Sequence, residues 1–300
     1  MALRTSAYQA FGVNFPENNR PWSKPRTQGV DRLSSLPDCL IHLIMSFLTT
    51  QEAVQTCVLS KRWKNLWITL PFLDFDVDEF NSDELDSDGM LKRDRVLVFI
   101  DFVSTMLLLR EASDLNKIRL TGYVASPFRI MRSWILYTLK HNLQVLNIDC
   151  IPECTLPLGF FTCASLADAS VGSYISLHNL DVINLPCFKQ LSLKDVDINQ
   201  DFVDKILCSC PVLEFLNLEG CSRDFSTINS QSLKYLKIQT WCFSKEAEKK
   251  MEFIDTPNLL SFSDSICPCL NGQKVPLKMP SLTSASIHLD VCDSNKLLVN

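Results

Sequence analysis

Glycine is scarce in this sequence, with 8 glycines among 300 residues. The motifs G-x-x-x-x-G-K, G-x-G-x-x-G and G-x-S-x-G are all missing, so neither a phosphate-binding loop nor a serine-hydrolase turn is expected. Histidine is also rare, and none of the 4 histidines is obviously paired with a cysteine nucleophile: His42, His141, His178 and His288. The sequence therefore makes no case for an enzyme.

Long hydrophobic runs and an excess of positive charge are missing as well. The longest apolar run, at positions 96–109, is short and contains Asp101, which indicates a helix rather than a membrane span. No apolar segment follows Arg4, so no signal peptide is predicted. The net charge is −5, whereas binding of a nucleic acid needs a basic patch on the protein surface. We expect neither a membrane nor a nucleic acid as a partner.

Cysteine, in contrast, is abundant, with 13 residues. Without a signal peptide, so many cysteines indicate reduced thiols in the nucleus, the cytoplasm or both. The pairs Cys208-x-Cys210 and Cys267-x-Cys269 raise the possibility of zinc, but their spacing is closer than that of the two pairs in a usual structural site. No metal and no cofactor is therefore predicted.

Positions 31–76 carry apolar residues at helical spacing, which predicts three helices. The first is entered through Pro37, a residue tolerated at a helix start, and carries an apolar stripe of Leu36, Leu40, Leu43, Ile44, Phe47 and Leu48. Thr49 and Glu52 form a capping box for the second helix. Ser60 caps a third helix, on which Trp63, Leu66 and Trp67 share one face. So short a stretch cannot bury all these groups within itself, which predicts a protein partner for part of the surface.

The order of these residues resembles an F-box, in the version found in plant F-box/leucine-rich-repeat proteins. Leu36-Pro37, Phe47-Leu48, Ala53-Val54 and the run from Val58 to Trp63 carry the resemblance, and Cys39 departs from an acidic residue that is frequent there. The resemblance implies a three-helix module that docks on a Skp-type adaptor, which joins a cullin and a RING subunit in a ubiquitin ligase. We expect the adaptor-binding residues to be Leu36, Pro37, Leu40, Ile44, Val58, Leu59 and Trp63.

The segments beside this module have simpler patterns. Positions 1–30 show no periodicity and indicate a flexible leader. Positions 77–91 are predicted to be an acidic linker, because carboxylates dominate there without the spacing of a calcium-binding loop. Apolar residues over about 92–109 then predict a helix that covers the first face of a repeat array.

A repeat, L-x-x-L-x-L, fills the remainder of the chain at intervals of 20 to 28 residues. It begins at Leu115, Leu143, Leu166, Phe188, Leu213, Leu233, Leu259 and Leu282. The positions between the leucines are mostly polar, as expected for a strand with one buried face, and Val145, Phe215 and Tyr235 are the main exceptions. The pattern predicts an α/β fold in which a short three-helix F-box precedes a leucine-rich-repeat solenoid at 92–300, with a curved, mostly parallel sheet.

The repeat also accounts for cysteines, because its consensus accepts one at the eighth position, where Cys221 and Cys267 fall. Related plant proteins often carry a C-terminal FBD domain, which we expect to be absent from this chain, since it stops at Asn300.

The family resemblance implies a substrate-recognition subunit that is not itself catalytic, with an unknown protein target on the repeats. The candidate target-binding residues are Arg119, Lys194, Phe215, Tyr235 and Lys237. The alternative is a repeat-based scaffold or small-molecule sensor that causes no turnover of a target.

Overall fold

The computed structural model describes residues 32–33, 35–60, 62–80, 90–110, 114–123, 128–151, 156–172, 182–239, 253–266 and 277–289. The chain divides into two compact units, residues 1–125 and 126–300. The predicted leader at 1–30 lies outside the described residues, as do positions 81–89 of the predicted linker.

The first unit begins with short helices: α2 (Asp38–Met45), α3 (Thr50–Gln55) and two 3₁₀ segments, η1 (Thr56–Val58) and η2 (Trp63–Thr69). The predicted capping box is present, since the Glu52 N–H donates to Thr49 Oγ1 at 3.3 Å and the Thr49 N–H donates to Glu52 Oε2 at 3.0 Å. Ser60 Oγ accepts from the Trp63 N–H at 3.4 Å, as expected of a cap. The predicted third helix is a 3₁₀ segment rather than an α-helix.

Helix α2 is shorter than its apolar stripe predicts. It ends at Met45, so Phe47 and Leu48 lie beyond it in a turn. The cause is local, because Thr49 already caps α3 and the Ser46 hydroxyl donates to the Leu43 carbonyl oxygen at 2.7 Å. The inward side of α2 is formed by Ile41 and Met45, which are fully buried.

The first unit continues with β1 (Phe72–Asp76), the 3₁₀ segment η3 (Val77–Phe80), α4 (Met90–Leu109) and β2 (Lys117–Tyr123). Strands β1 and β2 are parallel and pair in register from Phe72 with Lys117. Phe75 of β1 meets Phe102 of α4 edge to face, with ring centroids 5.9 Å apart. The core of this unit therefore joins the predicted F-box to a strand and a long helix.

The observed elements differ from the predicted domain boundaries. Val77 is buried in η3, so the chain is folded where the predicted linker begins, and α4 already starts at Met90. Helix α4 and β2 belong to the first unit, whereas the repeat domain was expected to start at 92. Val77 lies between acidic residues in the sequence, so composition alone did not predict that its side chain is buried.

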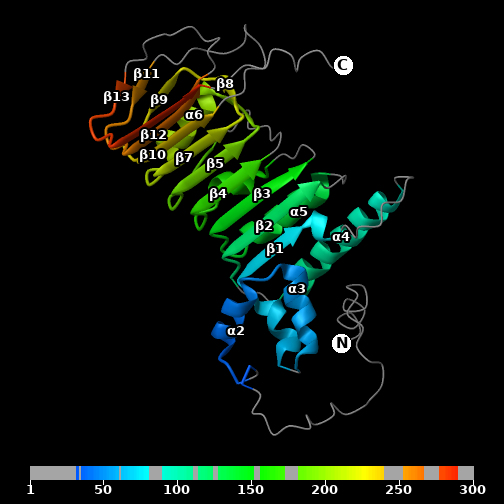
Figure 1. Ribbon diagram of the computed structural model, residues 1–300. Helices are drawn as coiled ribbons and strands as arrows, with labels where there is room; N and C mark the ends of the chain where they lie inside the picture. The colour runs from blue at the N-terminus through cyan, green and yellow to red at the C-terminus, as the bar shows by residue number, and fades with distance from the viewer. Residues whose placement is uncertain are drawn as a thin grey trace, which may run out of the picture. The chain divides into compact units, whose positions relative to one another are not determined.

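The second unit contains a ladder of parallel strands in the order β3-β4-β5-β7-β10-β12-β14 (Figure 1). Their bounds are Val145–Ile151, Asp168–Gly172, Gln190–Lys194, Phe215–Glu219, Tyr235–Gln239, Ser261–Ile266 and Ser284–Leu289. Each strand begins two residues after a predicted repeat start, as β2 does in the first unit. The predicted parallel sheet is confirmed, including its register.

The leucine positions of the repeat face the core, as the pattern requires. Alternate residues of the ladder strands from β3 to β10 are buried, for example Leu191 and Leu193 of β5 and Leu216 and Leu218 of β7. In the last strand, β14, the corresponding Ala285 and Ile287 are exposed. Helices α5 (Phe128–Leu139) and α6 (Gln200–Ser209) lie behind the ladder in Figure 1. The side of the ladder that bears the in-between positions is called the strand face from here on.

Short strands outside the ladder were not predicted. Strand β6 (Asp197–Asn199) pairs with β8 (Ser222–Asp224), while β9 (Thr227–Asn229), β11 (Phe253–Asp255) and β13 (Leu277–Lys278) form a separate sheet. Asp195 and Gly220, each directly after a ladder strand, have positive φ angles of 53° and 65°. This left-handed conformation turns the chain out of the ladder and favours glycine at position 220.

Candidate functional site

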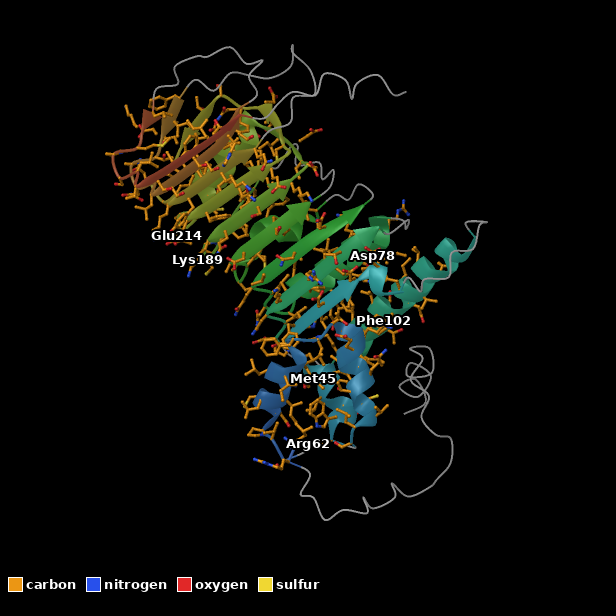
Figure 2. All side chains as sticks on the ribbon, viewed as in Figure 1. Met45, Arg62, Asp78, Phe102, Lys189 and Glu214 are labelled. Atoms are coloured by element: carbon orange, nitrogen blue, oxygen red, sulfur yellow. The ribbon has the colours of Figure 1, made fainter. Side chains whose placement is uncertain are left out.

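An apolar surface lies on the outer side of the first unit's helices. It is called the docking stripe here, and its large exposed side chains are Leu33, Leu40, Leu43, Ile44, Phe47, Val58 and Leu59. Their exposed fractions run from 38% for Ile44 to 83% for Phe47. Met45, on the opposite side of α2, is fully buried among the helices (Figure 2). Large apolar side chains exposed on one short module are candidates for contact with a protein partner.

Most of the predicted adaptor-binding residues lie at this surface. Leu40, Ile44, Val58 and Leu59 are exposed, Pro37 is exposed at the start of α2, and Leu36 is half-buried. Trp63 is different, because only 3% of it is exposed. It packs inside the module with Trp67 and can support the docking stripe without touching a partner that approaches from outside.

Three members of the docking stripe were not among the predicted site residues. Leu43 and Phe47 follow Leu36 and Leu40 in the same helical spacing, so the sequence contained a signal for both. Leu33 precedes the helix and belongs to no periodic pattern, so spacing alone does not identify it.

Polar contacts hold the ends of this module together. Arg62 forms an ion pair with Asp38 at the start of α2, with a nitrogen–oxygen distance of 2.5 Å. The ring nitrogen Nε2 of His42 lies 3.2 Å from Thr69 Oγ1, which places the histidine in a link between α2 and the end of η2. Arg62 is exposed.

The strand face brings some of the predicted target-binding residues together. Phe215 of β7 and Tyr235 of β10 are register partners, and their ring centroids are 6.3 Å apart. Lys237 lies on the same face two residues after Tyr235, and its ammonium nitrogen is 4.0 Å from Glu219. These residues form a continuous surface on two neighbouring strands.

The remaining two candidates each face a carboxylate. Lys194 also lies on the strand face, as the register partner of Glu219. Lys194 of β5 is 3.8 Å from Asp149 of β3. The contact passes over Gly172 of the intervening strand, where a Cβ would lie 2.7 Å from Asp149 Oδ1. Arg119 belongs to the first unit, where its Nε donates to Asp74 Oδ1 at 2.6 Å.

Of the two cysteines that the repeat pattern explains, Cys221 is buried. Cys221 Sγ donates to the carbonyl oxygens of Leu193 and Glu219 at 3.5 and 3.6 Å, and burial raises the pKa of its thiol to about 12. Burial likewise raises the pKa of Cys210 to about 12, while Cys208 is exposed. Cys267 and Cys269 lie outside the described residues. Within the described ranges, no group of three histidine, cysteine or acidic side chains is arranged to hold a metal ion.

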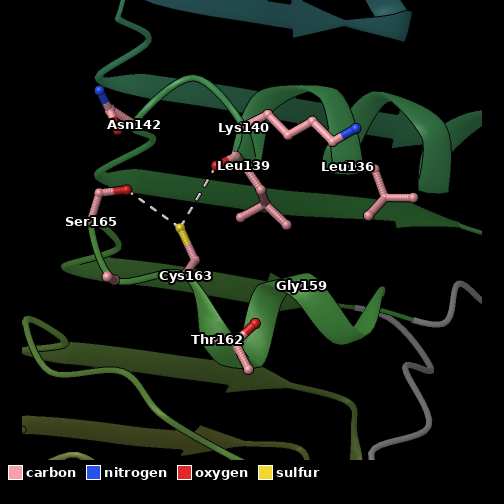
Figure 3. A pocket seen from close by; sticks show the side chains of 9 residues that line it. Leu136, Leu139, Lys140, Asn142, Gly159, Thr162, Cys163 and Ser165 are labelled. Atoms are coloured by element: carbon pink, nitrogen blue, oxygen red, sulfur yellow. Dashed lines mark hydrogen bonds between the residues drawn. The ribbon is translucent and has the colours of Figure 1, made fainter.

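A pocket of about 570 Å³ opens between the end of α5 and the 3₁₀ segment η4 (Leu158–Thr162) of the second unit (Figure 3). Cys163 lies in it, with its sulfur 3.4 Å from the Ser165 hydroxyl and 4.0 Å from the Leu139 carbonyl oxygen. Leu136 and Lys140 complete one wall. The lining provides a single ammonium group and no acid–base pair.

Among the described helices, none is both long enough and apolar enough to cross a membrane.

Comparison with known proteins identifies both parts of the chain. Residues 33–75 match the model of the F-box domain. Residues 131–281 match the model described as "FBD-associated F-box protein At5g56370, LRR repeats". The first match contains the helices that carry the docking stripe, and the second contains the ladder strands from β3 to β12.

The similar proteins come from Arabidopsis thaliana. The F-box/LRR-repeat protein At3g59200 is 35% identical over 271 residues, which are 86% of this chain and 50% of that protein. The F-box/LRR-repeat protein At4g14103 is 32% identical over 282 residues, 90% of this chain and 70% of that protein. The putative F-box/LRR-repeat protein At3g58880 is 33% identical over 239 residues, 77% of this chain and 51% of that protein.

No solved structure matches the chain significantly. The chain spans about half the length of the first relatives that it matches. The chain has an F-box followed by leucine-rich repeats, and F-box/LRR-repeat proteins align with most of its length. It therefore belongs to the family of plant F-box/LRR-repeat proteins.

Proposed function

We propose that the chain is the substrate-recognition subunit of a ubiquitin ligase of the Skp–cullin–F-box type. The observation that carries the proposal is the docking stripe, a set of large apolar side chains exposed on the very module that matches the F-box domain. The F-box binds a Skp-type adaptor, and through it a cullin and a RING subunit. The repeats bind the target protein.

The docking stripe can supply the free energy that an adaptor complex needs. Burying one large apolar side chain contributes about 1.5–3 kcal/mol. Leu40, Ile44 and Leu59 are all substantially exposed before binding, so each has area to lose on contact. Together, a few such contacts offset the loss of translational and rotational freedom on association.

The mechanism is proximity rather than chemistry performed by the chain itself. The F-box holds the ligase and the repeats hold the target, so ubiquitin transfer becomes effectively intramolecular. The chain acts as a non-catalytic adaptor in this scheme, in the nucleus, the cytoplasm or both.

The proposed target-binding residues are Phe215, Tyr235 and Lys237 on the strand face, with Lys194 beside them and Arg119 on the first unit. The aromatic pair supports this choice, because tyrosine and other aromatic residues are enriched where interfaces concentrate their binding energy.

Binding of the adaptor is tested by capture of a recombinant Skp-type adaptor on the immobilised full chain. Leu36→Ala and Pro37→Ala are expected to reduce the amount captured, with Val182→Ala, an exposed apolar residue of the second unit, as the matched control. Capture that is equal for all three variants and the unchanged chain contradicts the interface.

The alternative is a scaffold or small-molecule sensor without turnover. It is distinguished by deleting residues 31–76 while keeping the repeats. A receptor predicts that the abundance of a captured target rises after the deletion, because the target is still bound but no longer ubiquitinated. Unchanged abundance of every captured protein favours the scaffold.

A further inference from the structure

The strand face carries an exposed aromatic pair at its centre. Phe215 and Tyr235 are Cα partners on adjacent parallel strands, and their ring planes are tilted by 42°. Tyr235 is 44% exposed, although a side chain of this size buries a large apolar area when a partner covers it. The two rings together form an apolar platform, and this name is kept for them below.

Most strand-face positions beside the platform carry neutral hydrogen-bonding groups, and Lys237 is the exception. In its own row across the ladder, Gln190 of β5 precedes Phe215 and Ser261 of β12 follows Tyr235. In the next row, Ser192, Asn217 and Ser263 are neutral, and Lys237 of β10 lies between Asn217 and Ser263. Asn217 Oδ1 accepts no hydrogen bond from the described residues. Amide and hydroxyl groups of this kind pair with the main-chain N–H and C=O groups of an extended peptide.

The cations near the platform already face carboxylates. Lys237 is 4.0 Å from Glu219, and Lys194 is 3.8 Å from Asp149. Asp168, in the same row as Gln190, adds a further carboxyl group. On β12 and β14, the described strand-face positions carry only serine and His288: Ser261, Ser263, Ser265, Ser284, Ser286 and His288.

This balance of charge does not suit a phosphorylated ligand. A phosphoserine or phosphothreonine carries a charge of about −1.5 to −2, and its recognition depends on uncompensated arginine or lysine groups, arginine above all. The strand-face positions of β3 to β14 contain no arginine, and both lysines lie beside acidic side chains. A segment with little net charge fits the face better, because it leaves these ion pairs in place.

We infer that the strand face binds an extended, unphosphorylated segment of the target protein, with one large apolar side chain seated on Phe215 and Tyr235. The inference rests on the proposed function, since it specifies the kind of target that the repeats select. The neutral groups around the platform align the backbone of the segment, and Lys194 and Lys237 border it while paired with Asp149 and Glu219.

The test is selection of short random peptides displayed on phage by the immobilised full chain. A parallel array presents the same sequences with phosphoserine and phosphothreonine. The expected peptides carry tryptophan, phenylalanine or leucine at one shared position and little net charge. Their affinity falls about tenfold or more in Phe215→Ala combined with Tyr235→Ala, as expected for the loss of an interface anchor.

Two further variants separate the aromatic platform from the charges. Tyr235→Ser places at position 235 the residue that the same row has at Ser261 and Ser284, so the strand tolerates it, and it is expected to weaken peptide binding as well. Lys194→Ala combined with Lys237→Ala is expected to weaken binding less than the aromatic double variant does, because both lysines form exposed ion pairs.

Three results overturn the inference: selection of acidic sequences, a requirement for phosphate, or affinity that depends on the lysines and not on the aromatic residues. Failure to enrich any apolar peptide counts against it as well. Adaptor capture is measured on the same protein preparations. A chain that binds the adaptor but selects phosphopeptides refutes only this inference, whereas a chain that binds no adaptor refutes the proposed function.

Discussion

The hydroxyl oxygen of Thr50, at the first position of α3, accepts a hydrogen bond of 2.7 Å from the backbone N–H of Asp74 in β1. Thr50 is only 2% exposed. The bond therefore ties the F-box directly to the first strand of its own unit, and no flexible linker separates the helices from β1.

Replacing Thr50 by valine keeps the shape of the side chain but removes this acceptor. The Asp74 N–H then loses its partner, and the expected loss of unfolding free energy is about 1–3 kcal/mol. Hydrogen exchange followed by mass spectrometry is the appropriate measurement, because the amides of β1 should exchange faster. Thr162→Val, at an exposed position of η4, is the control. Unchanged exchange in β1 would show that the hydroxyl contributes nothing.

Gly172 is expected to tolerate no larger residue while Asp149 stays in place. A Cβ there lies 2.7 Å from Asp149 Oδ1, so Gly172→Ala should displace the carboxylate from Lys194 and lower the stability by at most about 1 kcal/mol. The measurement is the urea midpoint of the second unit's unfolding. Ser170→Ala, at an exposed position of the same strand, is the control.

A double variant identifies the cause. If the clash with Asp149 is responsible, Gly172→Ala should lower the stability little further in a chain that carries Asp149→Ala, because the exposed ion pair, which contributes at most about 1 kcal/mol, is already lost there. Additive losses in the two variants would place the strain elsewhere.

The buried cysteines predict a difference in reactivity within one short segment. Because the pKa of Cys210 is raised to about 12, its thiolate is rare near neutral pH, and burial blocks access as well. Cys208, two residues earlier, is exposed. Peptide mapping after treatment of the native chain with iodoacetamide should find Cys208 labelled well before Cys210 and Cys221. Equal labelling rates in the native state would contradict the described burial.

The same thiols give stability a pH dependence. Their folded pKa values, about 12, lie above the ordinary value of 9.0, so the unfolded chain loses these protons first as the pH rises. The contribution to stability is complete below about pH 9 and is lost as the pH approaches 12. Cys221→Ala should reduce the fall in urea midpoint between these values, and an unchanged fall would exclude Cys221 as its source.

The sequence predicted the ladder better than the F-box surface, for a physical reason. A strand with one buried face alternates, so the L-x-x-L-x-L pattern located each ladder strand from β3 to β14 to the residue at its start. Strand β1 has the same pattern in Leu70, Leu73 and Phe75, all buried, but it was hidden inside the stretch assigned to the F-box. The short strands outside the ladder contain too few residues to show any period.

Helix α2 shows why periodicity alone did not determine the binding surface. Both of its sides are apolar, with Ile41 and Met45 buried and Leu40 and Leu43 exposed. Spacing identifies residues that share a side but not which side packs on the module's own core. Trp63 was assigned to the interface for the same reason, although it fills the interior.

The most direct test of the docking stripe is the Kd of the full chain for a recombinant Skp-type adaptor, measured by isothermal titration calorimetry. Leu40→Ser and Leu59→Ser should each weaken binding by roughly tenfold or more, since each removes an apolar side chain that the complex buries. Leu158→Ser, at a leucine that is 70% exposed in the second unit, should change the Kd by no more than about twofold. Equal affinity of all three variants, or no binding by the unchanged chain, would contradict the assignment of the docking stripe as the adaptor-binding surface.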